Sequence, residues 1–326
     1  MSSDFHYNNL NATTKNPIIA NMKKTLVLSL IFVIACLFFS CTSRSPLIIL
    51  YNGDIRGEYE PCSCPNKPVG GLERRVHLIK TISKEVGPDN VIIVDSGNLL
   101  SPSPFPKPPS EKVIHRSCSV LGETYKGLGL ASIAIGPLDL MNIRIDELLK
   151  LQNSYSLPLI SANLTNGDGK NIYQKSIRVK VAKRTIEIIG ITSPKIAPPG
   201  DEVYQSYLKS NGLFVKNPLD ELPNLVEKAK KHVDLVILLS NLGLKNDEQI
   251  AKAIPGIDII IGGGGYQPLE NPVLVEKTLI FRESVQGRNL GLIEFVSKNK
   301  YRHQIIPITK NVALDSEVKR IVEKYK

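Results

Sequence analysis

The stretch LIILYNGDIRG, residues 47–57, carries the strongest indication of the fold. Its first five residues are all large and mostly apolar, without the alternation of a strand that faces water on one side. Such a continuous run is typical of a parallel strand that is buried on both faces. Asp54 and Arg56 follow it in the next turn. Because ligands of such sheets bind outside the carboxyl ends of the strands, this turn is the first candidate for a functional site.

The same pattern recurs along the chain and alternates with helical spacing. Leu72, Val76 and Ile79 would share one face of a helix, and so would Leu222 and Val226. Further apolar runs occupy residues 91–95, 131–135, 157–161, 186–191, 233–240 and 257–261. This alternation predicts an α/β protein with largely parallel strands.

Two pairs of segments have the pattern of β-hairpins, residues 177–181 with 185–189 and residues 290–296 with 303–308. We expect them to add antiparallel edges to the sheets. A final amphipathic helix is expected over residues 314–325. Because no low-complexity linker or internal repeat follows Pro46, a single domain over residues 47–326 is the simplest organisation.

Composition excludes several classes of protein. Of the 326 residues, 42% are apolar and 22% are charged, which excludes disordered and coiled-coil chains. The formal charge of +10 suits an anionic membrane surface or a phosphorylated ligand. No nucleic acid polymer is expected as a partner, because Trp is absent and no basic run is interleaved with aromatic residues. The five Cys are too few for a disulfide scaffold of this length.

Residues 1–40 have the pattern of a secretory signal region, with Met22 as the expected start. The apolar stretch over residues 25–39 would make about 22 Å of helix, which is short of the ~30 Å bilayer core, so we expect no permanent transmembrane helix. The segment before Cys41 resembles a bacterial lipobox, with Cys36 as the alternative acylated residue. An uncleaved signal anchor is the alternative interpretation. Residues 41–46 would then be a lipidated tether, and the protein would lie in the cell envelope, held to membrane lipid on the periplasmic face or the outer surface.

Five polar segments follow the expected strands, at residues 52–57, 95–98, 136–139, 240–243 and 262–266. In this order they resemble the metal-dependent phosphoesterase domain of the bacterial 5′-nucleotidase and UDP-sugar hydrolase family, of the calcineurin-like superfamily. Further matches are GGLERR at 70–75, SAN at 161–163, IIGIT at 188–192 and the block 234–263. The resemblance implies a four-layer α-β-β-α sandwich of the metallo-dependent phosphatase type. The family's C-terminal nucleotidase domain is not expected, because the chain ends before it.

The resemblance also implies two metal ions, and most residues that would hold them differ here. Asp54 matches an expected ligand, whereas Arg56 stands at a histidine position. Asn98 and Asn241 stand at an aspartate and a histidine position. The third motif is Pro137-Leu138-Asp139 in place of Asn-His-Glu, and the fifth is Gly263-Gly264-Gly265-Tyr266, without imidazole. We therefore expect the dinuclear site to be largely lost, and we assign no catalytic residue.

Two other roles remain for these positions. Asp54, Asn98 and Asn241 could form a weak remnant site for a single divalent metal ion. Arg56 and Arg74 are candidates for binding an anion, such as the phosphate of a small molecule. Asp54 could also serve only as the ion-pair partner of one of these arginines.

Cysteines supply a second candidate site. Cys62 and Cys64, in the segment PCSC at residues 61–64, lie at the upper edge of disulfide reach on an extended chain. Downstream, His115 and Cys118 would share one helix face. All four together are a plausible set of ligands for Zn²⁺ or Cu(I). The segment resembles a branch of the same superfamily in which Pro-Cys-x-Cys, or its selenocysteine version, precedes the Gly-Gly-Leu motif.

Each cysteine also has a simpler interpretation. The Cys62 and Cys64 pair could be a static loop staple, a redox pair with a thiol partner, or two idle thiols. Cys118 could be a small core residue, and His115 could face solvent.

Three functions remain open at this point. The first is an envelope lipoprotein that binds a ligand in the cleft or uses its cysteines for redox or metal chemistry. The second is a residual hydrolase of nucleotides or other phosphoesters. The third is a scaffold lipoprotein without chemistry.

Overall fold

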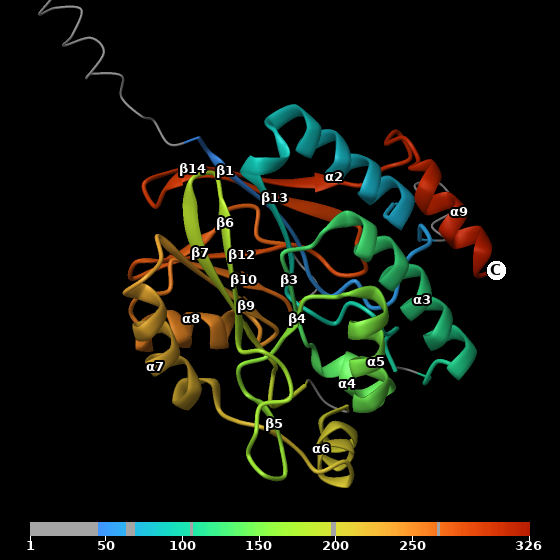
Figure 1. Cartoon of the computed structure of the whole chain (residues 1–326), viewed down its shortest axis with the longest axis horizontal. Helices are drawn as coiled ribbons and strands as arrows, with labels where there is room; N and C mark the ends of the chain where they lie inside the picture. The colour runs from blue at the N-terminus through green and yellow to red at the C-terminus, as the bar shows by residue number, and fades with distance from the viewer. Residues whose placement is uncertain (1–44, 63–68, 105–106, 197–199, 266–267) are drawn as a thin grey trace, which may run out of the picture. The chain divides into compact units, whose positions relative to one another are not determined.

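The computed structural model describes residues 45–62, 69–104, 107–196, 200–265 and 268–326 (Figure 1). Residues Ser45–Lys326 form one compact unit. Its frame is a pair of six-stranded sheets, which lie between two layers of helices in Figure 1.

The first sheet is built around the strand that opens the domain. Its strand order is β14 (Lys300–Pro307), β13 (Asn289–Ser297), β1 (Leu47–Asn52), β2 (Val91–Asp95), β3 (Ser132–Ala134) and β4 (Leu159–Ile160). Strands β1 to β4 run parallel, and the β13–β14 hairpin pairs antiparallel against β1. All six residues of β1 are buried, as its continuous apolar run predicts.

The second sheet repeats the arrangement of a parallel centre with antiparallel edges. Its order is β11 (Val273–Val275), β12 (Thr278–Arg282), β10 (Ile259–Gly262), β9 (Leu235–Ser240), β7 (Arg184–Ile191) and β6 (Ser176–Val181). Strands β12, β10, β9 and β7 are parallel, whereas β11 and β6 pair antiparallel at the two edges. A small ribbon of β5 (Leu164–Asn166) and β8 (Leu213–Val215) lies apart from both sheets.

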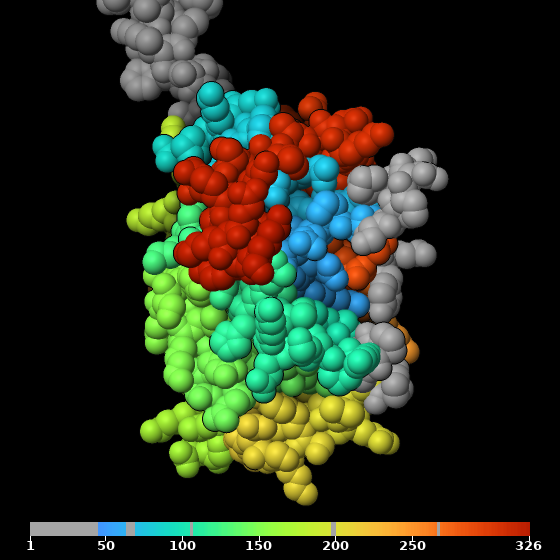
Figure 2. Space-filling view, turned by 90° about the vertical axis from the view of Figure 1, so that its right-hand side faces the viewer, coloured from blue at the N-terminus to red at the C-terminus, as the bar shows by residue number. Residues whose placement is uncertain are grey.

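Helices cover the outer faces of the two sheets. On the first sheet these are α2 (Leu72–Val86), α3 (Glu111–Leu128), α4 (Pro137–Asn142), α5 (Ile145–Tyr155), α6 (Gly200–Ser210) and α9 (Ser316–Lys324). A short 3-10 turn, Pro88–Asn90, connects α2 to β2. On the second sheet they are α7 (Pro218–Lys230) and α8 (Leu244–Ala253). In Figure 2, the red helix α9 lies on the helical face next to the cyan and green segments of α2 and α3.

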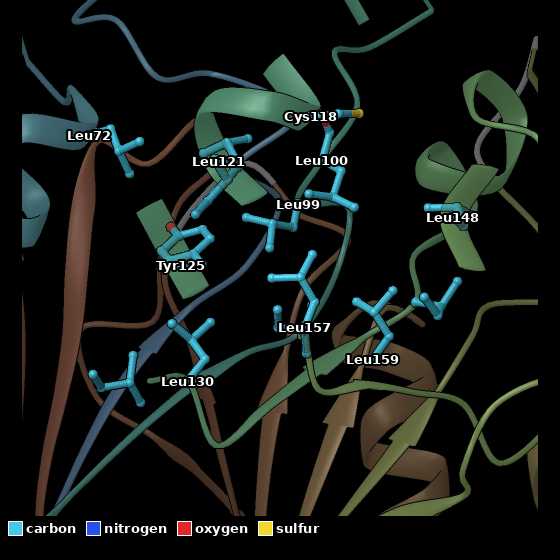
Figure 3. Close-up of a cluster of buried hydrophobic side chains, with 14 of the residues drawn as sticks. Leu72, Leu99, Leu100, Cys118, Leu121, Tyr125, Leu130, Leu148, Leu157 and Leu159 are labelled. Atoms are coloured by element: carbon cyan, nitrogen blue, oxygen red, sulfur yellow. The ribbon is translucent and has the colours of Figure 1, made fainter. Parts of the chain in front are cut away.

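Three apolar cores follow from this layering. One lies between the first sheet and its helices, and Figure 3 shows part of it around Leu72, Leu121 and Tyr125. A second fills the space between the two sheets, with Ile49 of β1 and Ile237 of β9 among its members. The third lies under α7 and α8. The expected α-β-β-α sandwich is therefore confirmed.

The predicted elements agree with the structure except in length and at the smaller strands. The expected hairpins are β6–β7 and β13–β14, and both give antiparallel edges. The run at residues 157–161 yields only the two-residue strand β4. Strands β11, β12, β5 and β8 were not predicted, because short runs such as Val273–Val275 carry no clear period. No helix in the described part of the chain has the length and apolar character needed to cross a membrane.

Candidate functional site in the cleft at the strand ends

The predicted polar segments meet in one cleft of about 960 Å³. Asp54 comes from the turn after β1, Asn98 from the turn after β2, and Leu138 from the start of α4. Asn241 follows β9 and Gly264 follows β10. Because these strands are parallel within their sheets, their carboxyl ends face the same opening. The five segments singled out from the sequence therefore lie together around one cleft.

Asp54 lies at the centre of this cleft and is only 1% exposed. Its Oδ1 accepts a hydrogen bond from the Asn98 Nδ2 at 2.6 Å. Its Oδ2 accepts one from the backbone N–H of Gly264. The Arg56 guanidinium is an ion-pair partner, with Nε 3.7 Å from Oδ1. Both carboxylate oxygens are thus engaged by donors from the protein itself.

The backbone around Asp54 has an unusual conformation. Asp54, Arg56 and Asn98 adopt left-handed φ values of 53°, 56° and 53°. Residues other than Gly adopt this backbone region at a cost in conformational energy, and the cost is smallest for Asn and Asp. Two hydrogen bonds hold the turns together, from Asp54 N to Gly97 O at 2.8 Å and from Arg56 N to Asn98 O at 2.7 Å. The two turns therefore present Asp54, Arg56 and Asn98 as one rigid group.

Asn98 is fixed from its other side by the third motif. Its Oδ1 accepts the backbone N–H of Leu138 at 2.9 Å. The motif's acid, Asp139, does not line the cleft; its carboxylate accepts backbone N–H groups of Leu100 at 2.9 Å and Gly136 at 3.3 Å, among others. Burial raises the pKa of Asp139 to about 6. Asp139 therefore joins the loops that carry Asn98.

Asn241 faces the cleft from the second sheet and is 5% exposed. Its Nδ2 donates to the carbonyl oxygen of Ser96. Its Oδ1 is buried and has no hydrogen-bond partner among the described residues. A buried amide oxygen of this kind is commonly satisfied by an ordered water molecule.

A layer of buried ionisable groups lies behind the cleft, and the sequence analysis missed it. Burial raises the pKa of Asp95 to about 7 and that of Glu283 well above its ordinary value. Arg75 is completely buried and donates to the Tyr125 hydroxyl at 3.2 Å and the Gly287 carbonyl at 2.8 Å. The unusual pair Arg74-Arg75 at the start of α2 was the available signal, because a helix N-terminus disfavours positive charge.

The glycine loop after β10 rests on a second buried group. Asp247 accepts a hydrogen bond from the Ser240 hydroxyl at 2.5 Å and forms an ion pair with Arg282 at 3.4 Å. Burial raises the pKa of Asp247 to about 7. A Cβ on Gly262 would lie 2.6 Å from Asp247 Oδ2, and one on Gly265 would lie 2.2 Å from the Arg282 guanidinium. The loop therefore passes close over this ion pair, and a side chain at either glycine would have to displace it.

The lining of the cleft combines few charges with amides and an apolar wall. Among the described lining residues, Arg56 and Lys195 are the cations and Asp54 is the only carboxylate. The amide side chains are those of Asn98, Asn217, Asn241, Asn246 and Gln249. The apolar wall includes Leu219 at the start of α7, Leu242 just before α8 and Ile250 within α8. Lys195 and this wall were not singled out from the sequence.

The other predicted site residues lie elsewhere. Arg74 does not line the cleft, and its Nη1 donates to the Gly70 carbonyl at 3.4 Å. Cys62 is half-buried, and its Sγ accepts the backbone N–H of Val69 at 3.4 Å. Cys64, Cys41, Cys36 and Tyr266 lie outside the described residues.

Cys118 belongs to the core between the first sheet and its helices, where Figure 3 shows it beside Leu100. Burial raises the pKa of its thiol to about 12, so it is a poor source of the thiolate that binds metals. His115 is exposed and lines, with Cys118 and Glu147, a separate pocket of about 220 Å³. No cluster of three or more His, Cys, Asp or Glu side chains suited to a metal ion occurs in the described part of the chain.

Comparisons with known proteins agree with this geometry. No family model matches the chain. It is 25% identical over 170 residues to the uncharacterized metallophosphoesterase YunD of Bacillus subtilis (strain 168), covering 51% of this chain and 35% of that protein. It is 25% identical over 307 residues to the 5′-nucleotidase of Mus musculus, covering 87% of this chain and 50% of that protein.

Among solved structures, the 5′-nucleotidase precursor of Thermus thermophilus superposes with a TM-score of 0.69 at 20% identity, covering 86% of this chain and 58% of that one. The chain has the fold of the metallophosphoesterase domain of 5′-nucleotidases. It spans between about a third and a half of the length of the curated relatives described above.

Proposed function

We propose that this protein binds a phosphorylated small molecule in the cleft, without a pair of metal ions, and is held in the cell envelope by a lipid anchor. The observation that carries the proposal is the surroundings of Asp54. Asn98, Gly264 and Arg56 supply donors and positive charge to its carboxylate. The related phosphoesterases are expected to place metal ions at this point.

The donor set does not fit two divalent ions. Asp54 is the only carboxylate among the described residues of the lining, and both of its oxygens already accept hydrogen bonds. A dication about 4 Å from the Arg56 guanidinium would be repelled by about 2 kcal/mol even in bulk water. The amide oxygens of Asn98 and Asn241 add no negative charge to offset this repulsion. We therefore assign no metal-dependent step to this cleft.

The same residues suit an anion with a ring or other apolar part. Arg56 and Lys195 outnumber Asp54, so the described lining has an excess of positive charge. A guanidinium binds phosphate oxygens through two parallel N–H groups, and an ammonium adds a point charge. The wall of Leu219, Leu242 and Ile250 offers apolar contact, and a cleft of about 960 Å³ has room for a nucleotide-sized molecule.

Calorimetry with inorganic phosphate and with nucleoside monophosphates tests this proposal on residues 45–326. We expect binding without added metal, tighter for the nucleotide because of the apolar wall. Arg56→Ala should weaken binding by about tenfold or more, since it removes a charge-assisted contact. Arg320→Ala, an exposed arginine on α9, is the matched control and should bind as the parent does. Absence of binding, or equal losses in both variants, would contradict the proposal.

A residual hydrolase is the second candidate, and the relatives favour it, because several of them are named 5′-nucleotidases. The relatives support phosphoester hydrolysis as the class of any reaction in this cleft. Turnover of nucleoside monophosphates with added Mn²⁺, abolished by Asp54→Ala, would establish this candidate in place of the first. We expect no turnover.

The lipid anchor rests on the sequence before the domain, since Cys41 precedes the first residue of β1, Leu47, by six positions. Detergent phase partitioning of the expressed full chain tests it. We expect the protein in the detergent phase, and Cys41→Ser in the aqueous phase. Loss of detergent partitioning in Cys36→Ser instead would assign the anchor to Cys36.

A thiol or metal role for Cys62 and Cys64 stays a prediction. Counting reactive thiols before and after mild reduction distinguishes a labile disulfide from two free thiols, because only the disulfide yields two new thiols on reduction. Zinc bound to the protein and lost in Cys62→Ser would support the metal alternative.

A further inference from the structure

The chain enters the domain at the end of the sandwich farthest from the cleft. Ser45 precedes β1, and Asp54 follows it. A six-residue strand spans about 20 Å, so these two residues lie at opposite ends of the first sheet. Figure 1 shows the blue start of β1 beside the upper end of the β6–β7 hairpin. We call this end of the domain the entry face.

One arginine ties the entry face together. Arg184, at the start of β7, is buried, and its Nη1 donates to the Ser45 carbonyl at 2.7 Å. Its Nη2 donates to the Val296 carbonyl at 3.2 Å, near the β13–β14 turn. The first described residue of the chain is therefore fixed between two hairpin turns, residues 181–184 and 297–300. This arrangement gives the entry face a defined shape.

Exposed lysines project from both turns. Lys183 sits in the tight turn of β6–β7, where it and Ala182 have positive φ values of 56° and 47°. Lys180 precedes this turn and Lys300 follows the other, and both are exposed. A groove of about 730 Å³ runs beside the first turn. Its lining includes three cationic residues, Lys180, Lys183 and Arg184, and one acidic residue, Asp89.

The acids of this face are partly engaged by other groups. Asp258 forms ion pairs with Lys230 at 2.6 Å and Lys298 at 2.8 Å. Asp234 accepts the backbone N–H of Thr185 at 2.9 Å. Together with the lysines of the two turns, these contacts leave an excess of positive charge around Ser45.

We infer that the entry face rests on an anionic lipid surface, with Lys180, Lys183 and Lys300 against the phosphate headgroups. Cys41 lies four residues before Ser45, a span of at most about 14 Å. A lipid on Cys41 would thus keep the face close enough to approach the membrane's surface charge, which extends over a Debye length of about 8–10 Å. The cleft would then open away from the membrane, toward small molecules in the aqueous phase.

Vesicle flotation tests this surface on residues 45–326, which contain all three cores and lack both candidate lipidation sites. We expect binding to vesicles of phosphatidylcholine with phosphatidylglycerol and not to phosphatidylcholine alone. Three lysines near an anionic surface raise partitioning on the order of a hundredfold. The variant Lys180→Glu/Lys183→Glu/Lys300→Glu should lose at least about tenfold of it.

The matched control carries the same change of charge at three exposed lysines outside the entry face, Lys107→Glu/Lys170→Glu/Lys209→Glu. It should retain most of the binding. Hydrogen exchange adds a direct readout, because amides of residues 181–184 and 297–300 should exchange more slowly with anionic vesicles present. Equal binding to neutral vesicles, equal losses in the two triple variants, or unchanged exchange at both turns would overturn the inference. Because the domain is tested without Cys41, failure of the anchor and failure of this surface are distinguishable.

Discussion

Asp54 follows β1 and Asp95 is the last residue of the neighbouring strand β2, yet their carboxylates are in opposite situations. Both oxygens of Asp54 accept hydrogen bonds, and a guanidinium lies nearby. Asp95 Oδ1 accepts the Gly97 N–H at 2.8 Å, whereas its buried Oδ2 has no hydrogen-bond partner in the described part of the chain. The protein thus neutralises Asp54 with donors and tolerates Asp95 by raising its pKa. The cleft is built to hold one anionic side chain, and the layer behind it is built around a buried cation, Arg75.

The largest effect is expected from that cation. Arg75→Met should lower the free energy of unfolding by about 2–4 kcal/mol, because it leaves the buried Tyr125 hydroxyl and Gly287 carbonyl without the charged donor that they share. Urea denaturation measures the change. Arg74→Met, at the half-buried neighbouring position, should change the free energy of unfolding by less than about 1 kcal/mol. Equal costs for the two variants would show that the buried hydrogen bonds of Arg75 do not stabilise the fold.

The pH dependence of stability sharpens the same contrast. The pKa of Asp95 is about 7 in the folded protein and about 4 in an unfolded chain, so the folded state binds more protons between these values. The contribution of Asp95 to the free energy of unfolding is fully present below about pH 4 and is lost as the pH rises through about 7. Its upper bound is on the order of 4 kcal/mol. Asp95→Asn should flatten this decline in urea denaturation, and Asp168→Asn, on an exposed turn, should not. A decline of the same steepness in Asp95→Asn would contradict the assignment.

The glycine that faces Asp54 gives a smaller effect. Gly264 has a φ of +74°, and an added Cβ would lie 2.8 Å from the Asn241 carbonyl oxygen. Gly264→Ala should therefore destabilise the fold by about 1–3 kcal/mol and weaken ligand binding, because the N–H that holds Asp54 moves. Gly127→Ala is the control, since nothing lies within 4 Å of its added Cβ inside α3. That variant should be neutral or slightly stabilising.

The smallest effect separates the two candidate functions. Asp54→Asn removes the only carboxylate among the described lining residues and the negative charge that competes with an anionic ligand for Arg56. Phosphate affinity should rise a few-fold, which corresponds to about 1 kcal/mol or less. A metal-dependent hydrolase would instead lose its activity. Asp146→Asn, an exposed acid on α5, is the matched control for calorimetry and should leave affinity unchanged.

The sequence predicted the fold well because its signals are local. Continuous apolar runs such as β1 and β9 mark strands buried on both faces, and the spacing of Leu72, Val76 and Ile79 marks the inner face of α2. The position of the candidate cleft followed from the same runs, because the polar segments that line it lie at the carboxyl ends of the strands. Predictions for Cys62, Cys64 and the lipid anchor stay predictions.

Other features depended on residues far apart in the chain. Nothing near Glu283 in the sequence indicates that its carboxylate accepts the Gly53 N–H at 3.1 Å, across 230 positions. Lys195, which follows β7, and Leu219, at the start of α7, line the cleft together with Asp54, although they lie 141 and 165 positions after it in the chain. Likewise, Arg184 meets Ser45 across 139 positions.

By itself, the sequence determined the layered α/β fold, the edge of the sheets where the cleft lies and the identity of the residues at the metal-binding positions. Only the tertiary structure decided that Asp54 is satisfied on both oxygens, that Arg75 is buried among acids and that lysines gather where the chain enters the domain. The reason is physical: side-chain periodicity reports burial within one element, whereas charge balance and hydrogen-bond satisfaction depend on which elements meet.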